Sequence, residues 1–235
     1  MFGVCDVVGA ISFRWTRLAA YLVAAAGAGV LLFYVNRLFA DLPMYAGDEG
    51  AYLIRALYGP QLAFDPGRYR DLQPVGNTVY FALVRIVDLL SLNVLPWMRL
   101  VGAACYFGGL AVLYRLAARE AGRPAANAVL LVAAAFPYYR FAFAAMPEGP
   151  YVAVLCLIIA VIYHTYLRRP MSGAAVVGAL SAVLVLIKPH GVAACLAFVV
   201  LAIGVGVWRG ETARHVAARL LVFAAAFLIM GTAIE

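Results

Sequence analysis

Two neighbouring carboxylates in the first third of the chain have the residue types needed for acid–base chemistry. Residues 47–52 read GDEGAY, which places Asp48 beside Glu49. Repulsion between adjacent carboxylates makes one of them a better proton acceptor, so the pair could supply a general base for an alcohol. If a helix begins here, Asp48 and Tyr52 lie one turn apart on one face. A structural role stays open, with Asp48 as a helix cap and Glu49 as a first-turn acid.

Basic residues expected on the outer side of a membrane form a second candidate set. They are Arg99, Arg140, Lys188 and His190. Cations at a membrane edge can bind lipid phosphate, and both Arg and Lys can stabilise a phosphate leaving group. Lys188 is the most suggestive, because residues 188–191 (KPHG) break a helix beside the charge. The alternative is that these side chains only extend toward water at helix ends.

Glu148 is a third candidate, since a carboxylate in an apolar stretch is costly unless it is paired or faces water. It lies in the sequence MPEGP at 146–150, where an apolar run begins. The alternative is an acid at a helix N-terminus, where the helix dipole favours it. The three histidines are scattered and the four cysteines show no CxxC spacing, so no cofactor is expected and a divalent metal, though not indicated, stays open.

The composition places the chain in lipid. Hydrophobic residues make up 66% of the 235 residues and charged residues only 12%, whereas soluble domains have about 45–50% and about 25%. A soluble fold could not hide this much apolar surface. The net charge of +7 comes from small basic clusters between apolar runs. This pattern fits the positive-inside rule of membrane proteins better than it fits a nucleic-acid partner.

Apolar runs of sufficient length predict an all-α fold, a polytopic transmembrane helical bundle of about seven spans. We treat residues 1–235 as a single transmembrane module, with an outer loop at 40–96 and the remaining spans at 97–235. The predicted spans are residues 18–39, 97–116, 125–137, 150–166, 173–187, 192–208 and 220–234.

The outer loop holds most of the acidic residues and two predicted amphipathic helices of the kind that lie in the membrane interface. The first covers 49–58 and is stopped by Gly59-Pro60. Residues 64–74 are rich in charge and turn formers, which predicts an irregular loop. The second helix covers 75–90, with an apolar stripe at helical spacing. That stripe consists of Val75, Val79, Leu83, Ile86, Val87 and Leu90.

The basic residues predict the orientation of the chain. Arg14 and Arg17 precede the first span, and Arg clusters follow the second, fourth and sixth spans. The positive-inside rule then puts the N-terminus in the cytoplasm and the 40–96 loop outside, in a plasma membrane or its equivalent. A cleaved signal peptide fits less well, because the first apolar run is long and no convincing cleavage site follows it.

In combination, the motifs resemble those of the GT-C membrane glycosyltransferases, most closely the protein mannosyltransferase and lipid A aminoarabinose transferase branch. Residues 73–76 (QPVG) differ from the His-Pro-Pro-Leu common in that family. Its members are usually longer, so the resemblance implies an N-terminal module. A truncated product, a divergent short member and one piece of a split enzyme stay open. The stretches that carry the resemblance are 47–52 (GDEGAY), 73–80 (QPVGNTVY), 97–102 (WMRLVG), 114–119 (YRLAAR), 146–149 (MPEG) and 187–191 (IKPHG).

The resemblance implies a transferase that moves a sugar from a polyprenyl-phosphate donor to an acceptor hydroxyl of a protein, glycan or lipid, with inversion. Asp48 matches the family's acidic catalytic position, with Glu49 beside it, and Lys188, Arg99 and Arg140 are candidates for binding the donor phosphate. Two rival readings stay open. One is a non-catalytic lipid-phosphate-binding membrane subunit that works with a partner subunit or a missing C-terminal part. The other is a transporter or flippase.

Overall fold

The protein is an all-α helical bundle. The computed structural model describes residues 48–62, 77–90, 92–135 and 143–234, and the regular structure within them is entirely helical. Two helical turns, the π-helical η2 and the 3-10 η3, interrupt the longer helices. In chain order the elements are α2 (Asp48–Leu62), α3 (Thr78–Leu89), α4 (Val94–Glu120), α5 (Gly122–Ala135), α7 (Glu148–Val161), η2 (Ile162–Tyr166), α8 (Pro170–Ile187), η3 (Pro189–Gly191), α9 (Val192–Trp208) and α10 (Ala213–Ile234).

Five of the described helical segments are long and apolar enough to cross a bilayer, which confirms a multi-pass membrane protein. They are α4, α7 with η2, α8, η3 with α9, and α10. The predicted span at 125–137 falls on α5, of which 14 residues are described. The predicted span at 18–39 and the predicted irregular loop at 64–74 lie outside the described residues.

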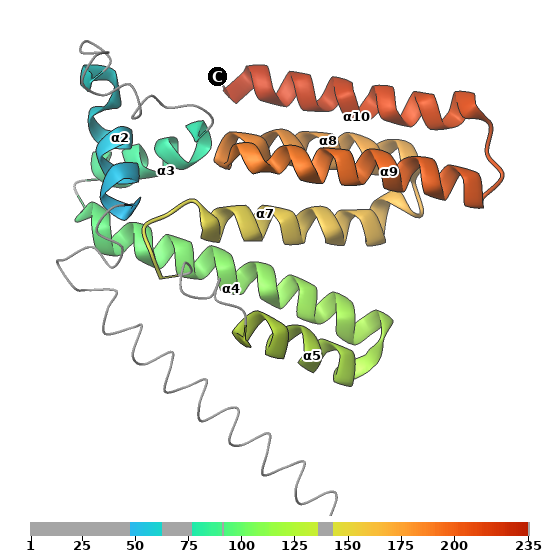
Figure 1. The fold of residues 1–235 in the computed structure, drawn as a ribbon, viewed down its shortest axis with the longest axis horizontal. Helices are drawn as coiled ribbons and strands as arrows, with labels where there is room; N and C mark the ends of the chain where they lie inside the picture. Colours follow the sequence, from blue (N-terminus) through green and yellow to red (C-terminus); the bar gives the residue numbers. More distant parts are fainter. Residues whose placement is uncertain (1–47, 63–76, 91, 136–142, 235) are drawn as a thin grey trace, which may run out of the picture. The chain divides into compact units, whose positions relative to one another are not determined.

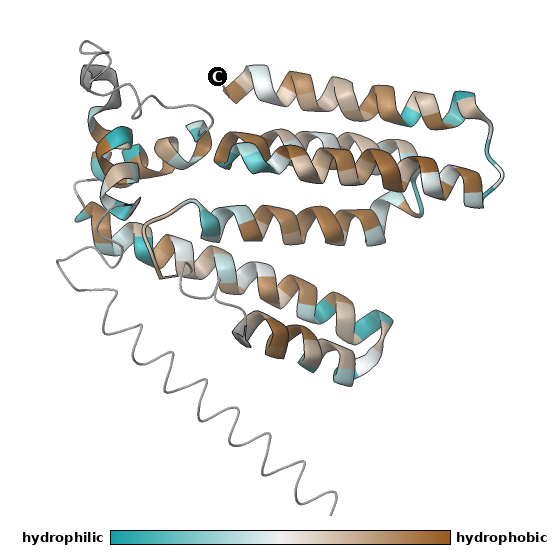
Figure 2. Ribbon diagram, in the orientation of Figure 1, coloured by the Kyte–Doolittle hydropathy of each residue, from teal (hydrophilic) through white to brown (hydrophobic). Residues whose placement is uncertain are grey.

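The long helices alternate in direction. In Figure 1, α4, α7 and α9 run one way, while α5, α8 and α10 return. Figure 2 shows apolar residues along the lengths of α7 to α10, with hydrophilic residues gathered near the helix ends and on α2. At one end Arg209 donates a 2.7 Å hydrogen bond from Nη2 to the Leu167 carbonyl, which ties the turn after α9 to the turn before α8. The other end carries α2, α3 and the candidate site.

Glycines allow the closest contacts between the helices. A Cβ added at Gly149 of α7 would lie 2.3 Å from the Gly102 carbonyl oxygen of α4. A Cβ at Gly178 of α8 would lie 2.3 Å from the Phe223 carbonyl oxygen of α10. Small residues at such crossings let helix backbones approach, and dispersion contacts then hold the helices together in lipid. The close contact at Gly149 therefore holds the first turn of α7 against α4.

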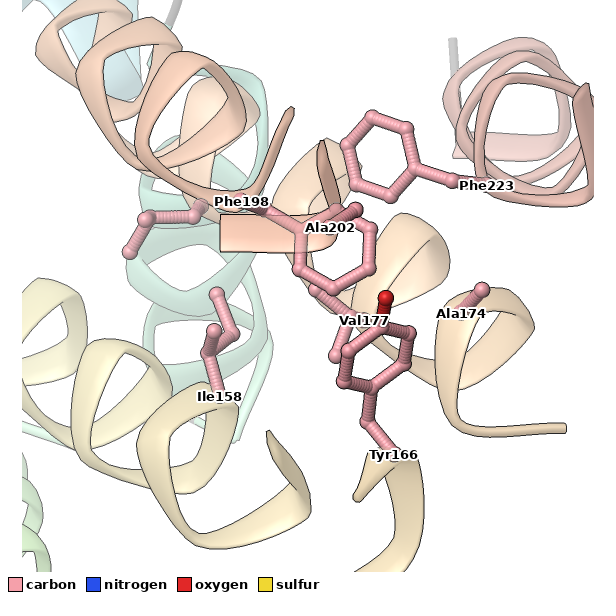
Figure 3. Close-up of a cluster of buried hydrophobic side chains, with 8 residues drawn as sticks. Ile158, Tyr166, Ala174, Val177, Phe198, Ala202 and Phe223 are labelled. Atoms are coloured by element: carbon pink, nitrogen blue, oxygen red, sulfur yellow. The ribbon is translucent and has the colours of Figure 1, made fainter. Parts of the chain in front are cut away.

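An aromatic cluster fills the space among α7 to α10 (Figure 3). The rings of Tyr166 and Phe198 meet edge to face with centroids 5.1 Å apart, and Phe198 stacks on Phe223 at 4.8 Å. Aromatic pairs in these geometries contribute about 0.5–1.5 kcal/mol each beyond their buried area. Ile158, Ala174 and Val177 complete the contacts seen in the view. The side chains around the Tyr166 ring are apolar and the Tyr166 hydroxyl is buried without a hydrogen-bond partner, so we assign the cluster to packing.

The predicted stop of the first amphipathic helix at Gly59-Pro60 is wrong, because α2 continues to Leu62. Pro60 has no N–H, so it cannot donate the helical hydrogen bond to the Ala56 carbonyl. Arg85 of α3 supplies that donor instead, from Nε to the Ala56 oxygen at 2.7 Å. Its Nη2 also donates to the Leu57 carbonyl at 3.2 Å. A tertiary contact thus replaces the bond that the proline removes.

The second amphipathic helix exists, and its predicted apolar stripe is only partly buried, with Val87 in the interior. Residues 75 and 76 lie outside the described part, and α3 begins at Thr78. The buried residues of α3 are Tyr80, Val84 and Val87, whereas Ile86 is 53% exposed and Leu90 63%. Because α3 is apolar on most of its circumference, the sequence pattern did not distinguish the side that packs against α2.

The last helix begins earlier than its predicted span of 220–234, at Ala213. Arg219 lies in this added helical part, is only 6% exposed, and pairs with Glu211 just before the helix. A charge at this position is acceptable because a carboxylate compensates it. The sixth span matches its prediction, since α9 is Val192–Trp208.

Candidate functional site

The short segment 143–147 that leads into α7 lies between two ion pairs. Ala144 and Ala145 are fully buried here. One pair joins α2 to α4, and the other joins the first residue of α7 to the end of α8. The two ion pairs therefore connect four helices, α2 with α4 and α7 with α8, next to the segment 143–147.

The first ion pair is Glu49 with Arg99. Arg99 donates from Nε to Oε1 and from Nη2 to Oε2 of Glu49, both at 3.0 Å, and both side chains are 0% exposed. The Ala145 backbone N–H donates a third hydrogen bond to Glu49 Oε1 at 2.6 Å. A bidentate pair with an extra donor is the geometry that offsets the large desolvation penalty of burying two charges.

This arrangement makes Glu49 and Arg99 a structural link between α2 and α4. The Glu49 carboxylate accepts from α4 and from the segment before α7, so the first turn of α2 is fixed against both. Neither charge is exposed to an incoming ligand. The sequence had offered Glu49, together with Asp48, as a catalytic candidate and Arg99 as a candidate for binding the donor phosphate. The structure brings them together with each other.

The second ion pair is Glu148 with Lys188. Lys188 Nζ donates to Glu148 Oε1 at 2.5 Å, and the two side chains are 25% and 14% exposed respectively. Glu148 is the first residue of α7, where the helix dipole favours a negative charge. This pair is therefore more accessible than the buried pair of Glu49 and Arg99.

The chain breaks at Lys188 for local reasons. Pro189 disfavours a helical residue before it, and Lys188 is extended, with φ −155° and ψ 128°. Its N–H still donates to the Leu184 carbonyl at 3.0 Å, which closes the last turn of α8. Gly191 then allows η3 to fold back, since a Cβ there would lie 2.7 Å from the Val185 backbone nitrogen. The break presents the Lys188 ammonium at the end of α8.

Tyr80 of α3 lies beside both ion pairs. The residue is 0% exposed, its hydroxyl has no hydrogen-bond partner, and its ring meets Tyr52 edge to face at 5.9 Å. Burial raises the pKa of Tyr80 well above its ordinary value, and the negative charges of Glu49 and Glu148 raise it further. The phenol therefore stays neutral over the physiological range.

A second polar atom at the site also lacks a partner. Glu148 Oε1 is bonded to Lys188, but Glu148 Oε2 is buried without a hydrogen bond. Buried polar atoms are nearly always hydrogen-bonded, so an orphaned carboxylate oxygen calls for an explanation.

The structure thus brings together Glu49, Tyr52, Arg99, Glu148 and Lys188 of the residues that the sequence singled out. Asp48 begins α2, but its side chain lies outside the described residues, as does all of Arg140. His190 lies exposed on η3.

Tyr80 was missed as a site residue, although it ends the 73–80 motif. The signal that could have indicated its burial is helical spacing. Tyr80 lies four residues before Val84 and seven before Val87, and these three are the buried residues of α3. Around these residues, the described part of the chain holds no group of three or more His, Cys, Asp or Glu suited to a metal ion.

The fold and the site define a polytopic helical membrane protein with a compact charged and phenolic site near one end of its long helices. Comparison of the chain with models of protein families, with curated proteins and with solved structures finds no match in any of the three.

Proposed function

We propose that this chain is a membrane-embedded glycosyltransferase module that moves a sugar from a polyprenyl-phosphate donor to an acceptor hydroxyl. The proposal is carried by the observation that residues 145–148 take part in both ion-pair sites. The Ala145 N–H bonds to Glu49, and Glu148 is itself the partner of Lys188. Through Ala145 this segment holds the first turn of α2, where Asp48 lies, and through Glu148 it holds Lys188. A candidate base and a candidate phosphate-binding cation are thus tied to one turn of chain.

Lys188 is the residue we assign to the donor phosphate. Its side chain is 25% exposed at a helix break, unlike the fully buried Arg99. A phosphate oxygen is an equivalent acceptor for the ammonium and could replace or join the Glu148 carboxylate. Arg140 remains a second cation for the phosphate. Neutralised in this way, the phosphate becomes a good leaving group, so the reaction needs no strong general acid.

Asp48 is the residue we assign to proton abstraction. It takes the proton of the acceptor hydroxyl, whose oxygen bonds to the anomeric carbon while the bond from that carbon to the phosphate oxygen breaks. Attack on the face opposite the phosphate inverts the configuration. Arg99 acts through Glu49 as a positioning residue, since their bond fixes the turn that follows Asp48.

The Arg-rich turns support an outer location for the site. Arg168, Arg169, Arg209 and Arg214 lie in or next to the turns at the end of the bundle opposite the site. By the positive-inside rule, we assign that end to the cytoplasm of a plasma membrane or its equivalent and the site to the outer face.

A non-catalytic lipid-phosphate-binding subunit is the second candidate function. The observation in its favour is that Glu49 and Glu148 are each paired with a cation. Such a subunit would need the cation of Lys188 but not the carboxylate of Asp48. The two candidates therefore differ in the effect of changing Asp48.

Donor binding is tested by native mass spectrometry of the protein extracted from its own membranes. The double variant Glu148→Gln/Lys188→Gln removes both charges but keeps an amide pair. We expect a co-purifying polyprenyl phosphate, or its sugar adduct, on the wild type and its loss in the double variant. The control is Arg168→Gln, an exposed charge at the opposite end of the helices. Absence of such lipid from the wild type, when other lipids survive, contradicts both candidates.

Transfer is tested in proteoliposomes by extracting polyprenyl-phosphate donors and acceptors from the native membrane and following sugar transfer. Asp48→Asn should lower transfer at least about 100-fold, as expected for loss of a general base, with donor binding retained. Asp88→Asn is the matched control, because Asp88 is an exposed carboxylate on α3. Donor binding by a wild type without transfer favours the non-catalytic candidate.

A further inference from the structure

Two buried oxygen atoms beside the ion pairs have no hydrogen-bond partner, namely Tyr80 Oη and Glu148 Oε2. Leaving such atoms buried and unsatisfied destabilises a protein by about 1–3 kcal/mol each. The remainder of the Glu148 carboxylate is paired, and the Tyr80 ring is well packed against Tyr52 and Phe81. Tyr166 Oη in the packing cluster is also buried without a partner, so one such atom alone does not indicate a ligand. Tyr80 Oη and Glu148 Oε2 differ because both adjoin the two ion pairs, and we take them together as the place of a bound group.

The two atoms belong to one site. Tyr80 packs in the same buried cluster as Met98 and Ala145, and Ala145 lies three residues before Glu148 in the segment that leads into α7. The Tyr80 phenol is also within electrostatic reach of the Glu148 carboxylate. Tyr80 is completely buried, so a group that bonds both oxygens would be largely withdrawn from solvent.

The two atoms together match a group that both donates and accepts, and a ligand hydroxyl is such a group. A carboxylate oxygen only accepts hydrogen bonds, whereas a phenol donates one and also accepts. A ligand hydroxyl can donate to Glu148 Oε2 and accept from the Tyr80 O–H, which satisfies both. An ammonium group could only donate, so the phenolic hydrogen would stay without an acceptor.

The charge of the site selects a neutral ligand group. Lys188 balances Glu148, and Arg99 balances Glu49. The described residues around Tyr80 thus offer no unbalanced carboxylate to attract a cation. A neutral hydroxyl enters without adding a charge to a buried site.

We propose that Glu148 Oε2 and Tyr80 Oη bind one hydroxyl group of a neutral sugar, the sugar carried by the lipid phosphate. The proposal rests on the proposed function, because it takes Lys188 as the phosphate-binding cation. Lys188 Nζ lies 2.5 Å from the other oxygen of the same Glu148 carboxylate. A phosphate at Lys188 therefore brings the sugar bonded to it next to Glu148 Oε2. Glu148 contacts the sugar, and Tyr80 fixes which hydroxyl it meets.

The test compares two soluble short-chain probes, citronellyl phosphate and citronellyl phosphate mannose, on protein in nanodiscs free of sugar detergents. We expect the wild type to bind the mannose-bearing probe at least about fivefold more tightly. Tyr80→Phe should lower that affinity about 3- to 10-fold, as loss of one hydrogen bond does, and should leave citronellyl phosphate binding unchanged. Tyr58→Phe is the control, because Tyr58 on α2 is 53% exposed.

Thermal unfolding without ligand separates binding from a structural role. Tyr80→Phe removes an orphaned hydroxyl and keeps the ring, so the ligand-free Tm should stay the same or rise. A lower Tm together with weaker binding of both probes indicates a structural hydroxyl and overturns the proposal.

The other outcomes are distinct. Equal binding of both probes by the wild type, or full retention of the mannose preference in Tyr80→Phe, overturns the sugar site and leaves the proposed function standing. Failure of the wild type to bind citronellyl phosphate overturns both. Tighter binding of a probe that carries an amino sugar overturns the assignment to a neutral hydroxyl.

Discussion

Arg99 and Glu49 lie 50 residues apart in the sequence and form a bidentate ion pair with no exposed atom on either side chain. The pair connects α2 to α4, and the Ala145 N–H adds the segment before α7. Removing one partner leaves a buried charge without compensation, while removing both leaves none. The energetics of this pair are therefore strongly non-additive.

Arg99→Met is expected to destabilise the protein by about 3–5 kcal/mol, the range for breaking a buried pair. Glu49→Gln should lower stability by a similar or smaller amount, because the amide oxygen can still accept the hydrogen bond from the Ala145 N–H. The double variant Arg99→Met/Glu49→Gln should recover a large part of the loss. Thermal unfolding in detergent measures all three variants. Additive losses in the double variant would show that the two side chains do not compensate each other.

Gly149→Ala is expected to destabilise the contact of α7 with α4 by about 1–3 kcal/mol, as overpacking does. The new methyl would lie 2.3 Å from the Gly102 carbonyl oxygen, so the helices must separate. Gly108→Ala on α4 is the control, since a Cβ there has nothing within 4 Å. It should be neutral or stabilise the helix by up to about 1 kcal/mol. Equal effects of the two changes on unfolding would contradict the close crossing.

Arg85→Met is expected to lower stability by about 1–2 kcal/mol, because the Ala56 carbonyl loses its donor. In a Pro60→Ala background the helix regains a backbone N–H for the Ala56 carbonyl. Arg85→Met should then lower stability by less. A double-mutant cycle by thermal unfolding gives the coupling between Arg85 and Pro60. A coupling of zero would mean that Arg85 does not replace the missing helical bond.

The raised pKa of Tyr80 makes stability depend on alkaline pH. In the unfolded chain tyrosine loses its proton near pH 10, whereas the buried phenol keeps it. The folded state then binds more protons than the unfolded state, so the contribution of Tyr80 is complete below about pH 10 and falls above it. The slope is about 1.4 kcal/mol per pH unit until the folded-state pKa is reached.

Tyr80→Phe removes this contribution, which isolates it from those of the other tyrosines. Denaturant unfolding at several pH values between about 9 and 11.5 should show a shallower decline for the variant. Tyr58→Phe, at an exposed position, should decline like the wild type. Parallel curves for wild type and Tyr80→Phe would place the folded-state pKa near its ordinary value.

Local sequence signals predicted α8 and α9 well, because residues at or beside the ends of these helices mark them. Arg168 and Arg169 precede α8, Pro170 begins it, and Lys188-Pro189 follows its last residue. The apolar run of α9 was predicted with its observed ends. Helix breakers and charges next to an apolar run act locally, so a sequence can show them without knowledge of the tertiary structure.

Long-range contacts decided what the sequence could not show. Nothing near Pro60 indicates that α2 continues to Leu62 or that Arg85 supplies a donor to the Ala56 carbonyl. Likewise, Glu49 and Arg99 both had the right residue types for direct chemistry. They pair across 50 residues of sequence, and no local pattern specifies such a long-range contact.

The ion pairs share an order along the chain that bears on how the protein is made. In each of the three largely buried pairs among the described residues, the acid precedes the base: Glu49 before Arg99, Glu148 before Lys188, and Glu211 before Arg219. The ribosome delivers residues from the N-terminus onward. Each of these cations therefore leaves the ribosome after its counter-ion. None enters the bilayer before the carboxylate that pairs with it has been synthesised.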